Sequence, residues 1–244
     1  MAKTTPRLFV DQPLAEGREV TLAPEQSHYL GTVLRLAPGD AVDVFNSQDG
    51  AFLANVAEAA KKKMVLRVER LTSAVTPPPD IDYLFAPLKH SRLDYLVQKA
   101  TELGARRLRP VITARTIAER VNLDRMRANV VEAAEQCNLI FVPEVLEPVS
   151  LNAALREWDK TRALIYCDEV ADKIGPLDGL AKVKLPAAVL VGPEGGFTVE
   201  ERAMLRALPY VTAISLGPRI MRADTAAVAV LALVQAALGD WRKP

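Results

Sequence analysis

The sequence predicts an α/β protein in which a small β-barrel precedes a parallel sheet with helices on both faces. Three observations support this fold class. Short apolar runs separated by turn-forming residues fill positions 1–72, and a proline-rich segment occupies 73–80. From 81 to 244, apolar runs of strand length alternate with helical patterns. Because 244 residues fit one large domain or two smaller ones, we expect domains at 1–72 and 81–244 with a linker at 73–80.

The first domain is predicted to contain strands because its apolar runs are short and end at turns such as Pro38-Gly39-Asp40. One helix is expected around Pro24–Leu34, with its proline in the first turn. Three consecutive prolines in the linker favour a stiff, extended chain. The expected strands are Arg7–Val10, Arg18–Leu22, Ala41–Asn46, Ala51–Glu58 and Met64–Leu71.

The second domain is predicted to alternate between strands and helices, the pattern of a parallel sheet. Thr198 and Glu201 form a capping box at the start of one helix. The expected strands are Ile81–Ala86, Leu108–Ile112, Ala163–Cys167, Ala187–Val191 and Val211–Leu216. The expected helices are Ser91–Leu103, Leu123–Asn138, Leu151–Trp158, Val199–Leu208 and Asp224–Leu238.

Composition excludes several classes of protein. The longest apolar stretch, Ala226–Leu238, is shorter than the roughly 20 residues that a bilayer span needs. The first seven residues carry charge, but no apolar segment follows them, so we expect no signal peptide. We therefore expect a cytoplasmic protein with no membrane partner. Two histidines and two widely spaced cysteines argue against a metal site. The phosphate-loop, dinucleotide-binding, nucleophile-elbow and zinc-protease motifs are all absent.

Positive charge is concentrated in one segment. The whole chain has a formal net charge of +1, but Lys89–Arg127 contains ten basic and four acidic residues. Such a segment can bind a polyanion such as RNA through its phosphates. A solvated surface of two helices and a loop remains the alternative.

Two glycine-bearing loops each join a predicted strand to a helix. The first, Val189–Phe197, has three glycines and no Lys or Arg, which favours a neutral or cationic ligand over a phosphate. A tight turn without a ligand is the alternative. The second, Ser215–Thr225, ends in polar residues before an apolar helix that is either core or a subunit interface. Asp224 or Thr225 is either a helix cap or a site residue.

These loops, with the sequences VGPEGG and SLGPRIMRADTAA, resemble the signature loops of the SPOUT class of methyltransferases. The match is closer to the family within it that methylates N3 of a uridine in 16S ribosomal RNA. The resemblance spans nearly the whole chain. Other matching segments are Leu96–Gly104, Pro110–Arg115, Glu132–Cys137, Arg7–Phe9 and His28–Arg35.

The resemblance implies a PUA-like, RNA-binding barrel and a SPOUT-type trefoil knot in the second domain. It implies S-adenosylmethionine as cofactor, no metal, 16S ribosomal RNA of the small subunit as substrate, and a homodimer with the active site at its interface. Arg222 and Asp224 are the implied catalytic residues. The cations implied to grip RNA are Arg7, Arg35, Lys89, Lys99 and Arg115. The implied cofactor-binding residues are Asp168, Glu169, Leu190, Gly192, Pro193, Glu194, Gly195, Gly196, Leu216, Gly217, Ile220, Met221 and Thr225.

The chain departs from the family pattern at two places. Ala223-Asp224 stand where the family has Thr-Glu, so the acid is shorter by one methylene. Asn138-Leu139 stand where it often has Gly-Arg, which removes a cation. Two alternatives belong to other classes of protein: a non-catalytic RNA-binding or ribosome assembly factor, and a nucleotide-dependent oxidoreductase. The intact glycines argue against the first, and the missing dinucleotide motif argues against the second.

Overall fold

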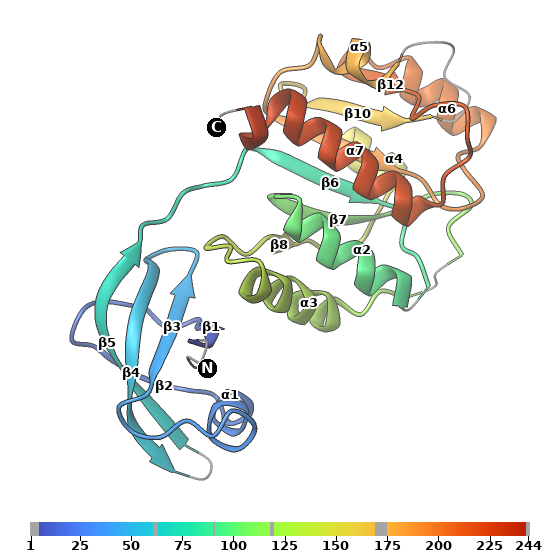
Figure 1. Cartoon of the computed structure of the whole chain (residues 1–244). Helices are drawn as coiled ribbons and strands as arrows, with labels where there is room; N and C mark the ends of the chain where they lie inside the picture. The colour runs from blue at the N-terminus through green and yellow to red at the C-terminus, as the bar shows by residue number, and fades with distance from the viewer. Residues whose placement is uncertain (1–4, 61–62, 90, 118–119, 169–174, 243–244) are drawn as a thin grey trace. The chain divides into compact units, whose positions relative to one another are not determined.

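The computed structural model describes residues 5–60, 63–89, 91–117, 120–168 and 175–242. They form two compact units (Figure 1). The first comprises Met1–Pro77 and Ala134–Val142, and the second comprises Pro78–Ala133 and Pro143–Pro244. The sequence did not predict that residues 134–142 group with the first unit.

The first unit contains a five-stranded sheet in the order β1-β3-β4-β5-β2. β1 pairs with β3 in parallel, and the other neighbours are antiparallel. Each strand overlaps a predicted run, because alternating apolar residues supply one buried face. The strands are β1 (Arg7–Phe9), β2 (Glu19–Thr21), β3 (Ala41–Asn46), β4 (Gly50–Ala60) and β5 (Lys63–Ser73).

The predicted helix of the first unit consists of two parts. α1 (Pro24–His28) has its proline in the first turn, as expected, and continues into a π-helical turn at Tyr29–Val33. Leu30 in this turn is fully buried against the sheet's core, which includes Val42 and Leu66.

Residues 134–142 complete the first unit through specific contacts. Arg7 pairs with Asp43 at 2.7 Å and donates a second hydrogen bond to the carbonyl of Leu139 at 2.8 Å. Its guanidinium lies 4.2 Å from the centre of the Phe45 ring. Ala134 belongs to the same hydrophobic cluster as Phe45, so this segment covers part of the sheet.

The second unit is built on a parallel sheet in the order β12-β10-β11-β6-β7-β8, and β9 also pairs with β7. Every ladder in it is parallel. The alternation of strands and helices therefore predicted the sheet type correctly. The strands are β6 (Ile81–Phe85), β7 (Arg107–Ile112), β8 (Glu144–Val145), β9 (Val149–Ser150), β10 (Ala163–Cys167), β11 (Ala187–Val191) and β12 (Val211–Ile214).

The α-helices of the second unit overlap the predicted ones, and one short helix, α5, was not predicted. β8, β9 and α5 were not predicted, because strands of two residues and a helix of five show no periodicity. None of the described helices is both long and apolar enough to span a bilayer. The helices are α2 (Ser91–Glu102), α3 (Leu123–Gln136), α4 (Leu151–Arg156), α5 (Pro176–Leu180), α6 (Val199–Arg206), α7 (Ala223–Leu238) and a final 3₁₀ turn at Asp240–Arg242.

Helices cover both faces of this sheet, as the sequence predicts. Side chains on one face, among them Tyr166 and Leu190, pack with Leu205 of α6 in a single core cluster. α2 and α7 lie side by side on the other face (Figure 1). Gln235, the polar residue in the apolar α7, is buried and donates a hydrogen bond to the carbonyl of Leu103 at 2.7 Å. It thereby satisfies a carbonyl at the end of α2.

Candidate active site

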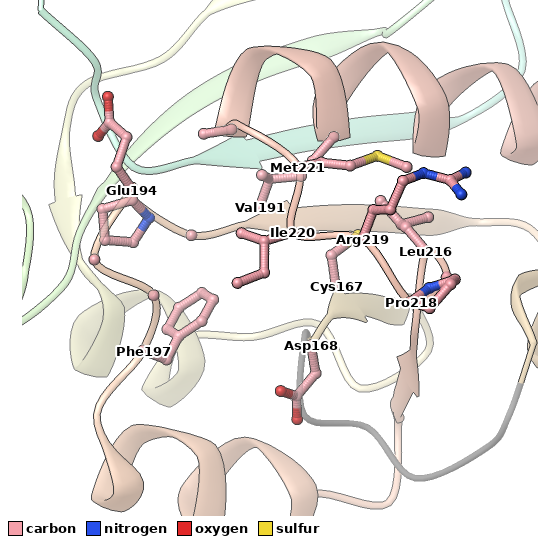
Figure 2. A pocket seen from close by; sticks show the side chains of 17 residues that line it. Cys167, Asp168, Val191, Glu194, Phe197, Leu216, Pro218, Arg219, Ile220 and Met221 are labelled. Atoms are coloured by element: carbon pink, nitrogen blue, oxygen red, sulfur yellow. The ribbon is translucent and has the colours of Figure 1, made fainter.

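Three loops at one edge of the parallel sheet surround a pocket of about 250 Å³. They follow the neighbouring strands β12, β10 and β11, whose carboxyl ends share this edge. Ligands of open parallel sheets bind at such an edge. Figure 2 shows the lining side chains, which come from Cys167–Asp168, Val191–Phe197, Leu216–Met221 and the first turns of α7.

The loop after β11 needs two of its glycines for different reasons. Gly196 has a φ of +65°, which L side chains rarely adopt. A Cβ at Gly192 would lie 2.5 Å from the ring of Phe197. That ring is buried edge-on against Tyr166 with centroids 5.0 Å apart. Gly192 therefore allows the aromatic ring to close the pocket floor.

The same loop is held by side chains from other elements. Arg115, in the loop after β7, donates to the carbonyl of Gly195 at 2.7 Å. Arg92 of α2 pairs with Glu194 at 3.2 Å, and its Nε lies 4.0 Å from the carboxylate of Asp224 in α7. These contacts give the pocket wall a defined shape that does not depend on the loop alone.

The predicted capping box is present at the start of α6. The Thr198 hydroxyl accepts a hydrogen bond from the Glu201 amide, and the Glu201 carboxylate accepts one from the Thr198 amide. A second oxygen of Glu201 accepts a hydrogen bond from the Ala114 amide at 2.8 Å. The cap thus also fixes the loop that carries Arg115.

Asp168 reaches the pocket wall, but its carboxylate is fully buried and pairs with Arg206 of α6, whose Nε lies 3.0 Å away. Figure 2 shows this carboxylate pointing away from Ile220 and Met221. Asp168 therefore anchors α6 in this structure. Burial, followed by the nearby Asp168 charge, raises the pKa of the Cys167 thiol to about 12. The thiol that lines the pocket is neutral at physiological pH.

The loop after β12 forms the outer wall. Gly217 has a φ of +104° with open space where a Cβ would stand. Ile220 is 92% exposed, an unusual state for a large apolar side chain. Pocket walls of apolar side chains and open backbone suit a ligand that combines a flat ring with a few polar groups.

α7 begins at Ala223, so of the two alternatives for Asp224 and Thr225 the structure excludes the helix cap. The cap position is Arg222, with extended backbone and no side-chain cap. Its carbonyl accepts the Ala226 amide at 2.8 Å, and its side chain is exposed and has no partner among the described residues. The Thr225 amide donates to the Asp224 carboxylate at 2.9 Å. Neither Arg222 nor Asp224 lines the pocket, but the chain neighbours of Arg222, Met221 and Ala223, do.

Most of the residues that the resemblance implied for the cofactor lie on the pocket wall, and two of the described ones do not. Leu190 is buried within β11, Thr225 is exposed on the first turn of α7 outside the lining, and Glu169 lies outside the described residues. The sequence missed seven lining residues; adjacency to the loop glycines could have identified Val191, Phe197 and Pro218, whereas the others lie elsewhere in these loops, at the end of β10 or in the first turns of α7. The seven are Cys167, Val191, Phe197, Pro218, Arg219, Ala223 and Ala226.

The cations implied to bind RNA differ in their surroundings. Arg35 is exposed with a φ of +55°. Lys89 is exposed two residues before α2, whereas Lys99 pairs with Glu102 at 2.7 Å. Arg7 and Arg115 are engaged as described above. Among the described residues, no group of three or more potential ligands could hold a metal ion.

Comparison with known proteins identifies the family. Residues 76–235 match the family model described as RNA methyltransferase domain, and residues 22–69 match the model described as RNA methyltransferase PUA domain. The predicted fold class, a parallel α/β domain after a PUA-like barrel, is confirmed.

Named relatives agree along most of the chain. Ribosomal RNA small subunit methyltransferase E of Rickettsia conorii is 29% identical, over 94% of this chain and 94% of its own. The protein of the same name from Synechocystis is 32% identical, over 90% of this chain and 73% of its own.

A solved structure shares both sequence and fold. Ribosomal RNA small subunit methyltransferase E from Neisseria gonorrhoeae, bound to S-adenosyl methionine, is 27% identical with a TM-score of 0.87. The match covers 98% of this chain and all of the other. The chain belongs to the RNA methyltransferase family whose members carry the name ribosomal RNA small subunit methyltransferase E.

Proposed function

We propose that this protein transfers the methyl group of S-adenosylmethionine to N3 of a uridine in 16S ribosomal RNA of the small subunit. The observation that carries the proposal is the pocket formed by the two glycine loops beside the unpaired Arg222. The relatives' names support ribosomal RNA as the substrate, and the cofactor seen in the Neisseria protein supports the donor. The choice of uridine N3 rests on the resemblance of the signature loops.

The residues present fit S-adenosylmethionine. Gly217 leaves open space beside the backbone, and Leu216, Ile220 and Met221 offer apolar surface for a flat adenine ring. Backbone groups of Gly192–Gly196 would hold the polar parts of the nucleoside. When bound, the cofactor supplies a methyl group already activated by its positively charged sulfur. The protein's task is then mainly to align donor and acceptor.

Arg222 is proposed to stabilise negative charge on the uracil ring as N3 loses its proton. A preorganised cation beside a developing oxyanion lowers the barrier most effectively when it needs no rearrangement. Arg222 is exposed and unpaired among the described residues, so no ion pair has to break first. Its position directly before α7 fixes its backbone.

Asp224 is proposed either to accept the N3 proton or to orient a neighbouring cation. Its side chain is 18% exposed and lies 4.0 Å from Arg92. The shorter acid in this chain therefore still faces a cation at the pocket's edge. The pH dependence of the residual turnover of Asp224→Asn distinguishes the two roles, because hydroxide at higher pH can replace a lost proton acceptor but not a lost orienting contact.

We also propose the homodimer, the trefoil knot and the cytoplasmic location that the family resemblance implies. Several apolar residues of α7 are only half buried in the single chain, among them Val228, Leu233 and Leu238. Ile220, in the loop before α7, is also exposed, and these apolar residues together support a second copy packing near the pocket. An enzyme that modifies the small subunit would act where ribosomes assemble.

The test uses undermethylated small ribosomal subunits and labelled cofactor, with mass mapping of the modified nucleotide. Wild-type protein should methylate one uridine at N3. Arg222→Ala should lower turnover by about 10²–10³-fold, as expected for loss of a charge-stabilising group. Cofactor affinity, measured by calorimetry, should stay within about threefold, because Arg222 is proposed to act on the uracil ring and not to hold the cofactor.

Arg156→Ala is the matched control, because Arg156 is an exposed arginine on α4, on the opposite face of the sheet from α7. It should retain full turnover. Unchanged turnover in Arg222→Ala would remove Arg222 from the mechanism, and a modified atom other than N3 would change the assigned reaction.

A further inference from the structure

The second unit contains another cavity, of about 770 Å³, which no role described above explains. We call it the α2–α3 cavity, since it lies between the starts of these two helices. β6 and β7 lead into it, and β6 is the neighbour of β11 in the parallel sheet. The cavity therefore opens at the same edge of the sheet as the candidate active site. Its lining residues are Leu88, Lys89, Leu93, Asp94, Ile117, Arg120, Val121, Asn122, Arg125 and Met126.

The floor of the α2–α3 cavity is apolar. Leu88 and Met126 are almost fully buried there, and Leu93 is partly exposed. Ile117 on the rim is 62% exposed, so a large apolar side chain is presented to solvent beside the cavity. Such a surface can hold the face of a ring, including a nucleobase.

The α2–α3 cavity remains positively charged after the ion pairs of its segment are taken into account. Most of the ten cations in Lys89–Arg127 contact a carboxylate or a carbonyl, as Arg107 contacts Asp82. Lys89, Arg109 and Arg120 have no such partner in the part of the chain that the structure describes. Two of these three, Lys89 and Arg120, line the α2–α3 cavity.

The acid in the cavity does not oppose an incoming anion strongly. Asp94 accepts hydrogen bonds from Nε and Nη2 of Arg125 at 2.8 and 2.6 Å, and from the Asn129 amide at 2.8 Å. Its charge is matched by the arginine fork. Two unmatched cations above an apolar floor suit a phosphate attached to a ring.

Both segments that form the cavity also contact the candidate active site. α2 carries Leu93 on the cavity side and Arg92, which pairs with Glu194 of the glycine loop. The loop after β7 carries Ile117 on the cavity side and Arg115, which holds the carbonyl of Gly195. An occupant of the cavity would therefore lie beside a substrate bound at the pocket.

We propose that the α2–α3 cavity binds one nucleotide of the RNA substrate close to the methylated uridine. Its base packs on Leu93 and Ile117, and its phosphate contacts Lys89 and Arg120. This inference rests on the proposed function and adds to it a second site that positions the RNA. Single-stranded RNA is commonly held in this way, by unstacked bases on apolar surfaces with cations on the backbone.

The experiment measures binding and methylation of undermethylated small subunits by a Lys89→Gln, Arg120→Gln double variant. Loss of two phosphate contacts should weaken subunit binding by about tenfold or more and reduce the slope of log K against log salt by about 1–2. Turnover at saturating subunits and cofactor affinity should stay within about threefold, since the methyl-transfer site is intact.

The matched control is Lys182→Gln, Lys184→Gln. Both lysines are exposed and precede β11, so they lie towards the opposite edge of the sheet. This control loses the same charge and should keep wild-type affinity and salt dependence. Ile117→Ser tests the apolar contact separately: it should weaken binding several-fold, about the loss of one stacking contact, without changing the salt slope. Since Ile117 is exposed, folding is not at stake.

Two different failures can be told apart. If wild-type protein methylates the subunits and the Lys89, Arg120 variant behaves like its control, the cavity does not bind the RNA and this inference is wrong. If wild-type protein neither binds nor methylates the subunits, the proposed function itself fails and this inference falls with it.

Discussion

Individual residues around the pocket have roles that their types alone do not reveal. Glycines in a ligand-binding loop are usually attributed to ligand access, yet Gly192 is required by the protein's own Phe197 ring. Gly195 has ordinary space, because a Cβ there would lie 3.5 Å from the side chain of Arg115. Position 195 should therefore tolerate an alanine, whereas position 192 should not.

A pair of alanine substitutions tests this difference. Gly192→Ala should lower the free energy of unfolding by about 1–3 kcal/mol, because the added methyl overlaps a buried ring. Gly195→Ala should change it by less than about 1 kcal/mol, since its contacts are of normal van der Waals length. Denaturant unfolding of both variants measures the two values. Equal stability losses would show that Phe197 does not enforce a glycine at position 192.

The two cysteines should also differ in reactivity. Burial and the adjacent Asp168 raise the pKa of Cys167 to about 12, so its thiol stays protonated below that pH. Cys137 is exposed. Because the thiolate is the reactive form, iodoacetamide at pH 8 should alkylate Cys137 at least about tenfold faster than Cys167. Mass spectrometry of tryptic peptides follows both sites, with Cys137→Ser as the control. Rapid alkylation of Cys167 at pH 8 would contradict this raised pKa.

At the scale of elements, a cluster of charged side chains connects the amino ends of the strands, at the edge of the sheet opposite the glycine loops. Asp80, just before β6, contacts Arg162 before β10 at 3.0 Å and Arg107 in β7 at 3.6 Å. Arg162 also donates to the carbonyl of Ala187 at 3.1 Å. One small cluster thus ties β6, β7, β10 and β11 together.

The pH dependence of Asp80→Asn tests this cluster. Partial burial raises the pKa of Asp80, but the hydrogen bond and charge of Arg162, with Arg106 and Arg107, outweigh it and lower the pKa below 3.8. A lowered folded-state pKa adds stability above the unfolded value, which is lost as pH falls through the folded value. Asp80→Asn should therefore cost about 1–2 kcal/mol at pH 7, allowing for its partial exposure.

The cost should shrink as the pH falls below 3.8, where the carboxyl of the unfolded chain becomes protonated, and should vanish below the lower pKa of the folded protein. Urea unfolding of both proteins at pH 7 and near pH 3 gives the two differences, and Asp178→Asn, at an exposed acid in α5, serves as the control. A difference that is independent of pH would assign the effect to packing rather than to charge.

For the whole molecule, the proposed homodimer affects the pocket as well as the number of copies. The single chain leaves Ile220 exposed and α7 partly covered, next to the pocket. If a second copy covers these residues, cofactor binding and association are linked, because a ligand that binds only the dimer stabilises it. If the proposed homodimer forms, a variant that weakens association should therefore also weaken cofactor binding.

Sedimentation equilibrium tests that consequence. Wild-type protein should sediment as a dimer at micromolar concentration. Leu233→Glu should shift it toward monomer by placing a charge in an apolar contact, and cofactor affinity should fall with it. Asn152→Glu, at an exposed position of α4, should remain dimeric. A monomeric wild-type protein, with or without cofactor, would rule out a site shared between subunits.

The sequence by itself determined the parallel sheet, the strand-rich first unit and the positions of the two glycine loops, because periodicity, capping and glycine spacing are local properties of the chain. It also predicted that Arg222 and the glycine loops form one site. Tertiary structure alone decided that Asp168 turns to Arg206, that Arg115 holds Gly195, and that Lys89 and Arg120 meet at a second cavity. The direction and partner of a long charged side chain depend on elements distant in sequence, and no local pattern encodes them.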